Sequence, residues 1–467
     1  MSHFFISAAH KSSGKTTISL GLCAALKSRN LKVRPFKKGP DYIDPMWLGK
    51  AAGADCHNLD FNTMGSEEIQ RTFHHYSTGF DISLIEGNKG LYDGLNLDGS
   101  NSNAALAMLL NTPVILVIDA RGMTRGIAPL ILGYQAFEPG LNIAGVILNQ
   151  LGGSRHESKL RAVIDHYTAL PVIGAVHHDQ ELTITERHLG LIPSNEISEA
   201  QRRITLLGQR IAQQVDLDAL LAIARKATFT INPAPATQQQ PFQLPNACRI
   251  GVAKDAAFGF YYPGDMEAFQ QAGAELVYFD TLHDKELPQV DGLFIGGGFP
   301  ETHMAALEAN RAMRQSVRNA VDAGLPIYAE CGGLMYLTRS LAWNRQRCEM
   351  AGAIPADTVM HAKPQGRGYV KLQETANHPW PTATNAKQTP EIAAHEFHYS
   401  SLENLSGVKF AYTVRRGTGI DGSHDGIVYK NVLGCYTHLR DVEQNHWVQR
   451  FLRFVQQHRS AKTSAIK

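Results

Sequence analysis

The fold is decided near the start of the chain, where residues 4–17 read FFISAAHKSSGKTT. The apolar run 4–9 predicts a buried strand, and residues 18–22 predict a helix that begins just after the polar loop. A loop between a strand and a helix directs backbone N–H groups and the positive helix end at phosphates. We therefore predict a nucleotide site whose phosphates are held by Gly14, Lys15, Thr16 and Thr17.

This loop departs from the P-loop pattern GxxxxGK[ST], because Ala9 stands where the pattern has its first glycine. Alanine is tolerated there only if its φ angle stays negative. Lys15 is expected to reach the outer phosphates and Thr16 a magnesium ion. The alternative interpretation is a helix-capping turn with a solvated lysine.

Short apolar runs separated by helix-length segments recur through both halves of the chain. They are residues 4–9, 82–85, 114–118, 144–148 and 172–176, and then 250–253, 275–279, 292–295 and 326–329. Such runs are typical of parallel strands buried on both faces, so we predict an α/β fold. Residues 228–246 lack periodicity and predict a linker between a first domain, 1–227, and a second, 247–461.

The composition is that of a globular chain, with 467 residues, 43% hydrophobic and 19% charged. Lys and Arg number 45 against 43 Asp and Glu, a balance that argues against nucleic acid as a partner. No apolar run is long enough to cross a membrane, and the six cysteines form no CxxC pair. We expect a cytoplasmic protein with neither a membrane nor a nucleic-acid partner.

Magnesium and a reacting carboxylate both need acidic groups near the phosphates. The candidates are Asp41 and Asp44 in PDYID, Glu86 after the run 82–85, and Asp93 in GLYDG. A carboxylate at the carboxyl end of a parallel strand points into the crevice where ligands bind, which suits Glu86 as a metal ligand. From spacing alone, a turn or cap role explains each acid equally well.

A second motif, GLPIYAECGGLMYL at residues 324–337, predicts a strand, a tight turn and a helix, with Cys331 at the apex. This arrangement exposes a nucleophile beside a helix N-terminus, which lowers a thiol pKa. The other five cysteines have no such setting and are expected to pack as small hydrophobes. The alternative is that Cys331 also packs as a small hydrophobic residue and has no chemical role.

A thiolate nucleophile needs a base that can also protonate a leaving amine, usually histidine. His438 follows an apolar strand near the end of the domain, and His395 and His398 are rivals. An oxyanion hole needs backbone N–H groups, for which Gly297, Gly298 and Gly332 are the candidates. The alternative for the run 296–298 is an ordinary glycine-rich turn. HExxH spacing is absent around His395, which argues against zinc.

Together these motifs resemble the cobyrinate a,c-diamide synthase family, ATP-dependent enzymes that use glutamine nitrogen to amidate tetrapyrrole carboxylates. The resemblance spans nearly the whole chain and rests on matches at residues 35–45, 86–94, 145–149, 186–191, 255–258, 296–301, 330–333 and 395–400. It implies a dethiobiotin-synthetase-like parallel-sheet domain followed by a class I glutamine amidotransferase-like α/β domain. A homodimer is one oligomeric state left open.

The resemblance also implies the chemistry. Cys331 would form a glutamyl thioester with His438 as base, and the released ammonia would travel to the other domain. There ATP would phosphorylate a carboxylate of an anionic tetrapyrrole, and ammonia would displace the phosphate. Asp41, Asp44, Glu86 and Asp93 match family positions linked with magnesium, ATP and the substrate. We predict Thr16, Asp41 and Glu86 as magnesium ligands, and Tyr42, Asp44, Lys89 and Asp93 as substrate-binding residues.

The sequence departs from the family in three places. The corrin enzymes usually carry apolar residues in place of Asn88 and Lys89, and His in place of Trp47. These changes leave open a sister activity on sirohaem or sirohydrochlorin, with a solvated Lys89 as the alternative. Arg440 stands where other glutaminases have the triad Glu, and the family resemblance implies that a Cys/His pair suffices.

Two further interpretations compete with the amidotransferase. A P-loop partitioning or regulatory ATPase would carry a signature Lys where this chain has His10, and would lack a cysteine elbow. A glutaminase domain that serves only as a scaffold is disfavoured by Cys331 and His438, because both are intact.

Overall fold

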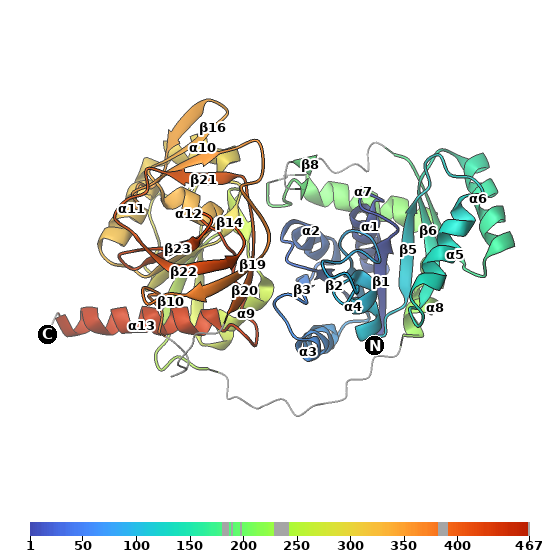
Figure 1. Cartoon of the computed structure of the whole chain (residues 1–467), viewed down its shortest axis with the longest axis horizontal. Coiled ribbons are helices and arrows are strands. Elements are labelled where there is room, and N and C mark those ends of the chain that lie inside the picture. The colour runs from blue at the N-terminus through green and yellow to red at the C-terminus, as the bar shows by residue number, and fades with distance from the viewer. Residues whose placement is uncertain (180–185, 188–189, 197–198, 228–241, 382–390, 466–467) are drawn as a thin grey trace. The chain divides into compact units, whose positions relative to one another are not determined.

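The chain folds into two compact units, Met1–Ala236 and Thr237–Lys467 (Figure 1). The structure, a computed structural model, describes residues 1–179, 186–187, 190–196, 199–227, 242–381 and 391–465. Most of the predicted linker lies outside the described residues, so its bounds and those of the two domains stay predictions. Among the described residues, no helix has the length and apolar character needed to span a membrane.

The first unit is built on a seven-stranded parallel sheet of order β3-β2-β4-β1-β5-β6-β7. The strands are β1 Ser2–Ala8, β2 Val33–Lys38, β3 His57–Leu59, β4 Ile82–Glu86, β5 Val114–Asp119, β6 Ile143–Leu151 and β7 Val172–His177. The helices are α1 Lys15–Ser28, α2 Ile43–Ala52, α3 Ser66–Ser77, α4 Asn103–Leu109, α5 Ile127–Phe137, α6 Ser154–Tyr167, α7 Ala200–Gln214 and α8 Leu217–Arg225. A small pair, β8 Glu186–Arg187 and β9 Gly190–Leu191, lies outside this sheet.

The five strands predicted for this half are confirmed. β1 lies at the centre of the sheet between β4 and β5, where Phe4, Phe5 and Ile6 are fully buried. A strand covered on both faces needs apolar side chains pointing both ways, which is the pattern the sequence shows. The parallel direction places the carboxyl ends of β1, β2 and β4 at one edge.

Close packing of α1 against α7 fixes the helix that begins at the nucleotide loop. A Cβ added at Gly21 of α1 would lie 2.2 Å from Ile211 Cγ1, and one at Gly208 of α7 would lie 2.8 Å from the Ala24 Cβ. The two helices therefore approach through glycine and alanine, and larger side chains would push them apart.

The second unit contains a nine-stranded mixed sheet of order β12-β10-β13-β15-β24-β23-β22-β19-β20. Its strands are β10 Cys248–Ala253, β12 Ala274–Phe279, β13 Gly292–Ile295, β15 Ile327–Glu330, β19 Gly366–Glu374, β20 Ile392–His398, β22 Lys409–Arg416, β23 His424–Tyr429 and β24 Val432–Cys435. The first five in this order are parallel and the rest antiparallel. The four strands predicted from the sequence are β10, β12, β13 and β15.

Smaller elements complete this unit. The remaining strands are β11 Phe258–Phe260, β14 Gly297–Gly298, β16 Ser340–Trp343, β17 Gln346–Glu349, β18 Asp357–Met360 and β21 Ser400–Glu403. The helices are α9 Pro263–Gln271, the 3-10 helix Pro300–His303, α10 Met304–Ala309, α11 Arg311–Asp322, α12 Gly332–Leu337 and α13 Trp447–Ala465. The predicted α/β class is confirmed in both units.

Candidate active sites

The nucleotide loop has the backbone that a phosphate site requires. Gly14 adopts a φ of 88°, and a Cβ there would fall 2.1 Å from Asn149 Nδ2. The Asn149 side-chain amide donates to the Ser13 carbonyl at 2.9 Å, so a hydrogen bond fixes the loop to the end of β6. Ala9 is not among the residues with positive φ, and the condition under which alanine replaces glycine is met.

Lys15 begins α1 and is buried, with its ammonium donating to the Lys89 carbonyl at 2.6 Å. Burial and the charge of Lys37 lower the pKa of Lys15 to about 8. An anion beside the ammonium would offset this cost of burial, as phosphates do for a P-loop lysine.

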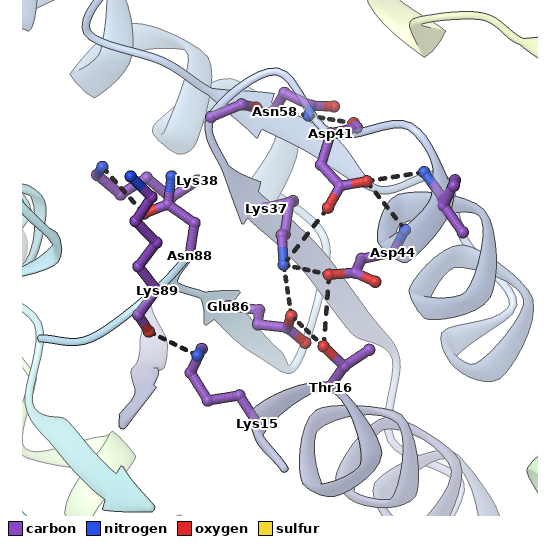
Figure 2. Close-up of polar contacts among 12 residues, drawn as sticks. Lys15, Thr16, Lys37, Lys38, Asp41, Asp44, Asn58, Glu86, Asn88 and Lys89 are labelled. Carbon is purple, nitrogen blue, oxygen red and sulfur yellow. Dashed lines mark hydrogen bonds and ion pairs between the residues drawn. The ribbon is translucent and has the colours of Figure 1, made fainter. Parts of the chain in front are cut away.

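A cluster of charged side chains lies beside the loop, where β2 and β4 end (Figure 2). Lys37 Nζ donates to Asp44 Oδ2 and to Glu86 Oε1, both at 2.5 Å. The Thr16 hydroxyl donates to the same two carboxylates, at 2.9 Å to Glu86 and 3.3 Å to Asp44. The structure therefore joins three residues named from the sequence, Thr16, Asp44 and Glu86, through a lysine that was missed.

Burial and the neighbouring charges together set the charge states in this cluster. Burial alone would lower the pKa of Lys37, but the carboxylates of Asp44 and Glu86 raise it well above its usual value. Burial raises the pKa of Glu86 despite Lys37, whereas the Lys37 ammonium outweighs burial and lowers the pKa of Asp44. Lys37 is thus a fixed cation, and Glu86 is fully buried beside it.

The other acids predicted for this site make turn contacts. Asp41 Oδ1 accepts from the N–H groups of Ile43 at 2.8 Å and Asp44 at 3.2 Å, and its Oδ2 lies 3.9 Å from Lys37 Nζ. Asp93 Oδ2 accepts from the Gly90 N–H at 2.9 Å. Tyr42 is buried directly before α2. These contacts match the alternative kept for the acids, and their substrate and metal roles stay predictions.

Trp47 is fully buried in α2, and its indole donates to the Ile192 carbonyl at 2.9 Å. Its side chain is a packing group here. Of the departures from the family noted in this domain, Asn88 and Lys89 are the ones beside the charged cluster (Figure 2).

Cys331 occupies a strained turn between β15 and α12. Its φ of 48° and ψ of −101° are unusual for a residue with a side chain, and its N–H donates to the Cys435 carbonyl at 2.7 Å. Close backbone contacts surround the turn: a Cβ on Gly333 would fall 2.1 Å from the Ile295 carbonyl oxygen. The predicted strand, tight turn and helix are present, with Cys331 at the turn. A side chain at Gly333 would clash with the Ile295 backbone.

The base and the predicted oxyanion glycines gather beside this turn. A Cβ added at Gly332 would lie 3.0 Å from the Gly298 nitrogen, and one at Gly297 would lie 2.7 Å from His438 Cε1. The imidazole of His438 therefore packs against the Gly297 backbone, close to the residue that follows the cysteine. The catalytic and oxyanion roles themselves stay predictions.

Glu330, the residue before the cysteine, was missed by sequence reasoning. Its Oε2 lies 3.2 Å from His438 Nδ1, and its Oε1 accepts from the Leu439 N–H at 3.0 Å and the Tyr328 hydroxyl at 2.6 Å. A carboxylate at this position accepts from the Nδ1–H tautomer of a neutral imidazole, the tautomer whose Nε2 can act as a base. Glu330 is therefore our candidate for the acid that orients His438.

The rival histidines have other surroundings. The His395 ring stacks on His438 with centroids 4.9 Å apart, and its backbone carbonyl accepts from the His438 N–H at 2.8 Å. Burial and the neighbouring His438 lower the pKa of His395 well below its usual value, so it stays neutral. The ring of His398 stacks on Tyr436 instead, at 3.9 Å.

The thiol of Cys331 is held in its neutral form. Burial, and next the negative charge of Glu301, raise the pKa of Cys331 above its usual value. The sequence predicted the opposite effect from the helix N-terminus, but burial dominates in this structure. All six cysteines are buried, so the backbone strain of Cys331 is what distinguishes it from the other five.

Comparisons with known proteins identify a family for each half of the chain. Residues 5–192 match the CobQ/CobB/MinD/ParA nucleotide binding domain, and residues 249–445 match the CobB/CobQ-like glutamine amidotransferase domain. A protein of Magnetococcus marinus named cobyrinate a,c-diamide synthase is 47% identical over 96% of both chains. The chain belongs to the cobyrinate a,c-diamide synthase family. Relatives of the same name from Methanosarcina barkeri and Archaeoglobus fulgidus are 42% and 37% identical, over 94% of this chain.

Membership of the cobyrinate a,c-diamide synthase family removes one of the interpretations left open by the sequence. The chain is a glutamine-dependent, amide-forming ligase with a nucleotide-binding domain. The partitioning or regulatory ATPase, whose second domain would merely bind, is therefore dropped.

We expect Glu330→Gln to lower the glutamine-dependent kcat by about 100-fold, with little change in the KM for glutamine. The Tyr328 hydroxyl and Leu439 N–H both need an acceptor, so the amide oxygen faces them and the amide nitrogen faces His438 Nδ1. That nitrogen donates, which forces the His438 proton onto Nε2 and removes the base.

Steady-state kinetics with glutamine and with ammonia would test this. Ammonia-dependent activity should stay at the wild-type level. Tyr328→Phe, which keeps the carboxylate, is the matched control and should remain within a few-fold of wild type. A Glu330→Gln enzyme with wild-type glutamine turnover would contradict the role of Glu330.

Proposed function

We propose that this protein transfers the amide nitrogen of glutamine to the a and c carboxylates of cobyrinate, at the expense of ATP. The observation that carries the proposal is that a strained Cys331 turn, a His438–Glu330 pair and a nucleotide loop occur in a chain similar to such synthases over nearly its whole length. A nitrogen donor and an activated carboxylate are the two things that such a reaction requires.

The glutaminase unit supplies ammonia. His438 Nε2 takes the proton of the Cys331 thiol, and the sulfur attacks the side-chain carbonyl carbon of glutamine. The carbon–nitrogen bond breaks as His438 returns the proton to the leaving nitrogen, which gives ammonia and a glutamyl thioester. Backbone N–H groups of Gly298 and Gly332 would stabilise the oxyanion. Water then hydrolyses the thioester to glutamate and restores the thiol.

The synthetase unit activates the acceptor. A carboxylate oxygen of the tetrapyrrole attacks the terminal phosphorus of ATP, which forms an acyl phosphate and releases ADP. Ammonia then attacks the acyl carbon, phosphate leaves, and the nitrogen loses a proton as the amide forms. Lys15 and Lys37 provide the positive charge that a transferred phosphoryl group needs.

The residues around Thr16 fit a magnesium ion. Glu86 Oε2 is buried without a hydrogen-bond partner in the described structure, and the Thr16 hydroxyl and Asp44 carboxylate lie beside its Oε1. Hydroxyl and carboxylate oxygens are the ligands that Mg²⁺ prefers. Thr16, Glu86 and Asp44 would hold the ion, and Asp41 lies farther out, next to Lys37. The ion would neutralise charge on the phosphates of ATP.

Mass spectrometry of the products tests the proposal directly. Incubation with ATP, magnesium, glutamine and cobyrinic acid should give a species about two mass units lighter, since each acid converted to an amide loses about one. Sirohydrochlorin and sirohaem in place of the corrin test the sister activity. Failure to amidate any of the three would refute the proposed function.

We expect Cys331→Ser to abolish the use of glutamine while the use of ammonium ions continues. The serine hydroxyl is a poor nucleophile in this centre, whereas the synthetase unit needs only free ammonia. The same product analysis, run with glutamine and then with an ammonium salt, measures both. Loss of both activities in a folded variant would show that the two centres are not separate.

The buried, protonated thiol predicts a slow glutaminase in the absence of the other substrates. Glutamate release by the enzyme with glutamine alone should be at least about tenfold slower than with ATP and acceptor present. A coupled glutamate assay measures both rates. Full-rate hydrolysis by the enzyme with glutamine alone would contradict this prediction.

A further inference from the structure

Lys38, the last residue of β2, carries a buried ammonium group that makes no ion pair with a carboxylate among the described residues, although the Asp60 carboxylate acts on it through space. Only 6% of the residue is exposed. Among the described residues, its one hydrogen bond is a weak contact of 3.4 Å from Nζ to the Asn88 side-chain oxygen, and it forms no ion pair. A buried charge is costly unless it is paired, so this side chain points to a ligand.

Burial outweighs the compensation that the ammonium receives. It lowers the pKa of Lys38 to about 8; the Asp60 carboxylate is the largest of the nearby charges and opposes this shift, whereas the positive charges of Lys89 and Lys37 add to it. Lys15 in the same unit is buried to a similar degree and its pKa is lowered to the same value. The ligand expected for Lys15 is a phosphate, and Lys38 shows the same need for an anion.

Lys89 adds a second positive charge at this place. Figure 2 shows the polar ends of Lys38, Asn88 and Lys89 gathered together, to one side of the Lys37 cluster. Lys89 is exposed and adopts a φ of 41°, which few residues other than glycine do. Its ammonium is therefore available to a ligand that enters from solvent.

The backbone around Lys89 is fixed by its neighbours. Asn103 Nδ2 donates to the carbonyls of Asn88 and, at 2.8 Å, of Gly90, and its Oδ1 accepts from the Asn88 N–H at 3.2 Å. The Lys89 carbonyl accepts from Lys15 Nζ. These bonds hold the strained segment in position before a ligand arrives, which lowers the entropic cost of binding.

The Lys38 side chain does not contact Thr16, Asp44 or Glu86, the residues beside the predicted phosphate site. Lys37 faces Thr16, Asp44 and Glu86, and successive side chains of a strand point to opposite faces. Lys38 accordingly contacts Asn88, on the other side of β2. The ligand for Lys38 is therefore a different anion from the phosphates beside Lys15 and Thr16.

We propose that Lys38, Lys89 and the Asn88 amide form a subsite for a carboxylate of the acceptor other than the one being amidated. This inference rests on the proposed function, in which the acceptor is a macrocycle with several carboxylates. Anchoring one carboxylate there would position another for reaction at the nucleotide. A phosphate could also bind between two ammonium groups. The test must therefore show whether Lys38 affects the binding of the acceptor or the binding of ATP.

Kinetics with ammonia as nitrogen donor tests the subsite without the glutaminase. We expect Lys38→Gln to raise the KM for cobyrinic acid by about tenfold or more, and Lys89→Gln to raise it less, because its ammonium is solvated. The KM for ATP should stay within about twofold of wild type. Lys159→Gln, an exposed lysine on α6, is the matched control and should behave as wild type.

A binding measurement keeps the test independent of turnover and of misfolding. Isothermal titration without ATP should show weaker binding of the a,c-diamide to Lys38→Gln than to wild type, because this compound keeps the other carboxylates. Lys38→Arg, which keeps the charge, should restore most of the affinity in a variant of similar thermal stability.

The outcomes separate this inference from the proposed function. A wild-type enzyme that amidates no tetrapyrrole refutes the proposed function. If the wild-type enzyme amidates cobyrinic acid and Lys38→Gln binds the a,c-diamide as tightly as wild type does, the subsite alone is refuted. A rise in the KM for ATP with no change for the acceptor would assign the site to phosphate and also refute it.

Discussion

The buried Lys37 ammonium, held at 2.5 Å from both Glu86 and Asp44, is the interaction on which the synthetase unit depends. It ties the end of β2 to the end of β4 and to the first turn of α2, while Thr16 brings in the start of α1. Removing one partner would leave the other charge buried and unpaired, which is far costlier than the pair is stabilising. The ion pairs of Lys37 with Glu86 and Asp44 are therefore expected to remain formed, and they fix the positions of these side chains.

In the glutaminase unit a buried carboxylate, that of Glu330, likewise lies beside a basic group. The basic group there is the His438 imidazole, which is a weaker base than a lysine amine. Glu330 is buried at the end of β15 and is satisfied by three donors, one of which is His438. In both units a carboxylate at the carboxyl end of a parallel strand orients a basic group, and the backbone beside it is glycine-rich. Parallel sheets leave strand ends open at one edge, where ligands can reach such groups.

The apolar strands and the two glycine-bearing loops could be predicted from the sequence because each is a local pattern. β2 could not, because VRPFKK carries three cations in six residues and only the fold shows that Lys37 and Lys38 are buried. Lys37 was missed for the same reason. Glu330 was missed because its partner His438 lies 108 residues away, and no local spacing signals that contact.

The antiparallel half of the second sheet was also missed. Its strands β19, β20 and β22 mix charged and apolar residues, so they carry neither a continuous apolar run nor a strict alternation. The state of the Cys331 thiol depended on burial, which outweighed the helix N-terminus that the sequence pattern emphasised. The missed features thus came from long-range contacts and burial.

The central claim is that nitrogen released at Cys331 ends in an amide made at the nucleotide site. Its most direct test uses glutamine labelled with ¹⁵N in the side-chain amide, ATP and cobyrinic acid, in a buffer containing unlabelled ammonium ions. The account predicts that the amides of the product carry the ¹⁵N label, and that Cys331→Ser gives only unlabelled amides. Unlabelled amides from the wild-type enzyme, with glutamine consumed, would contradict it.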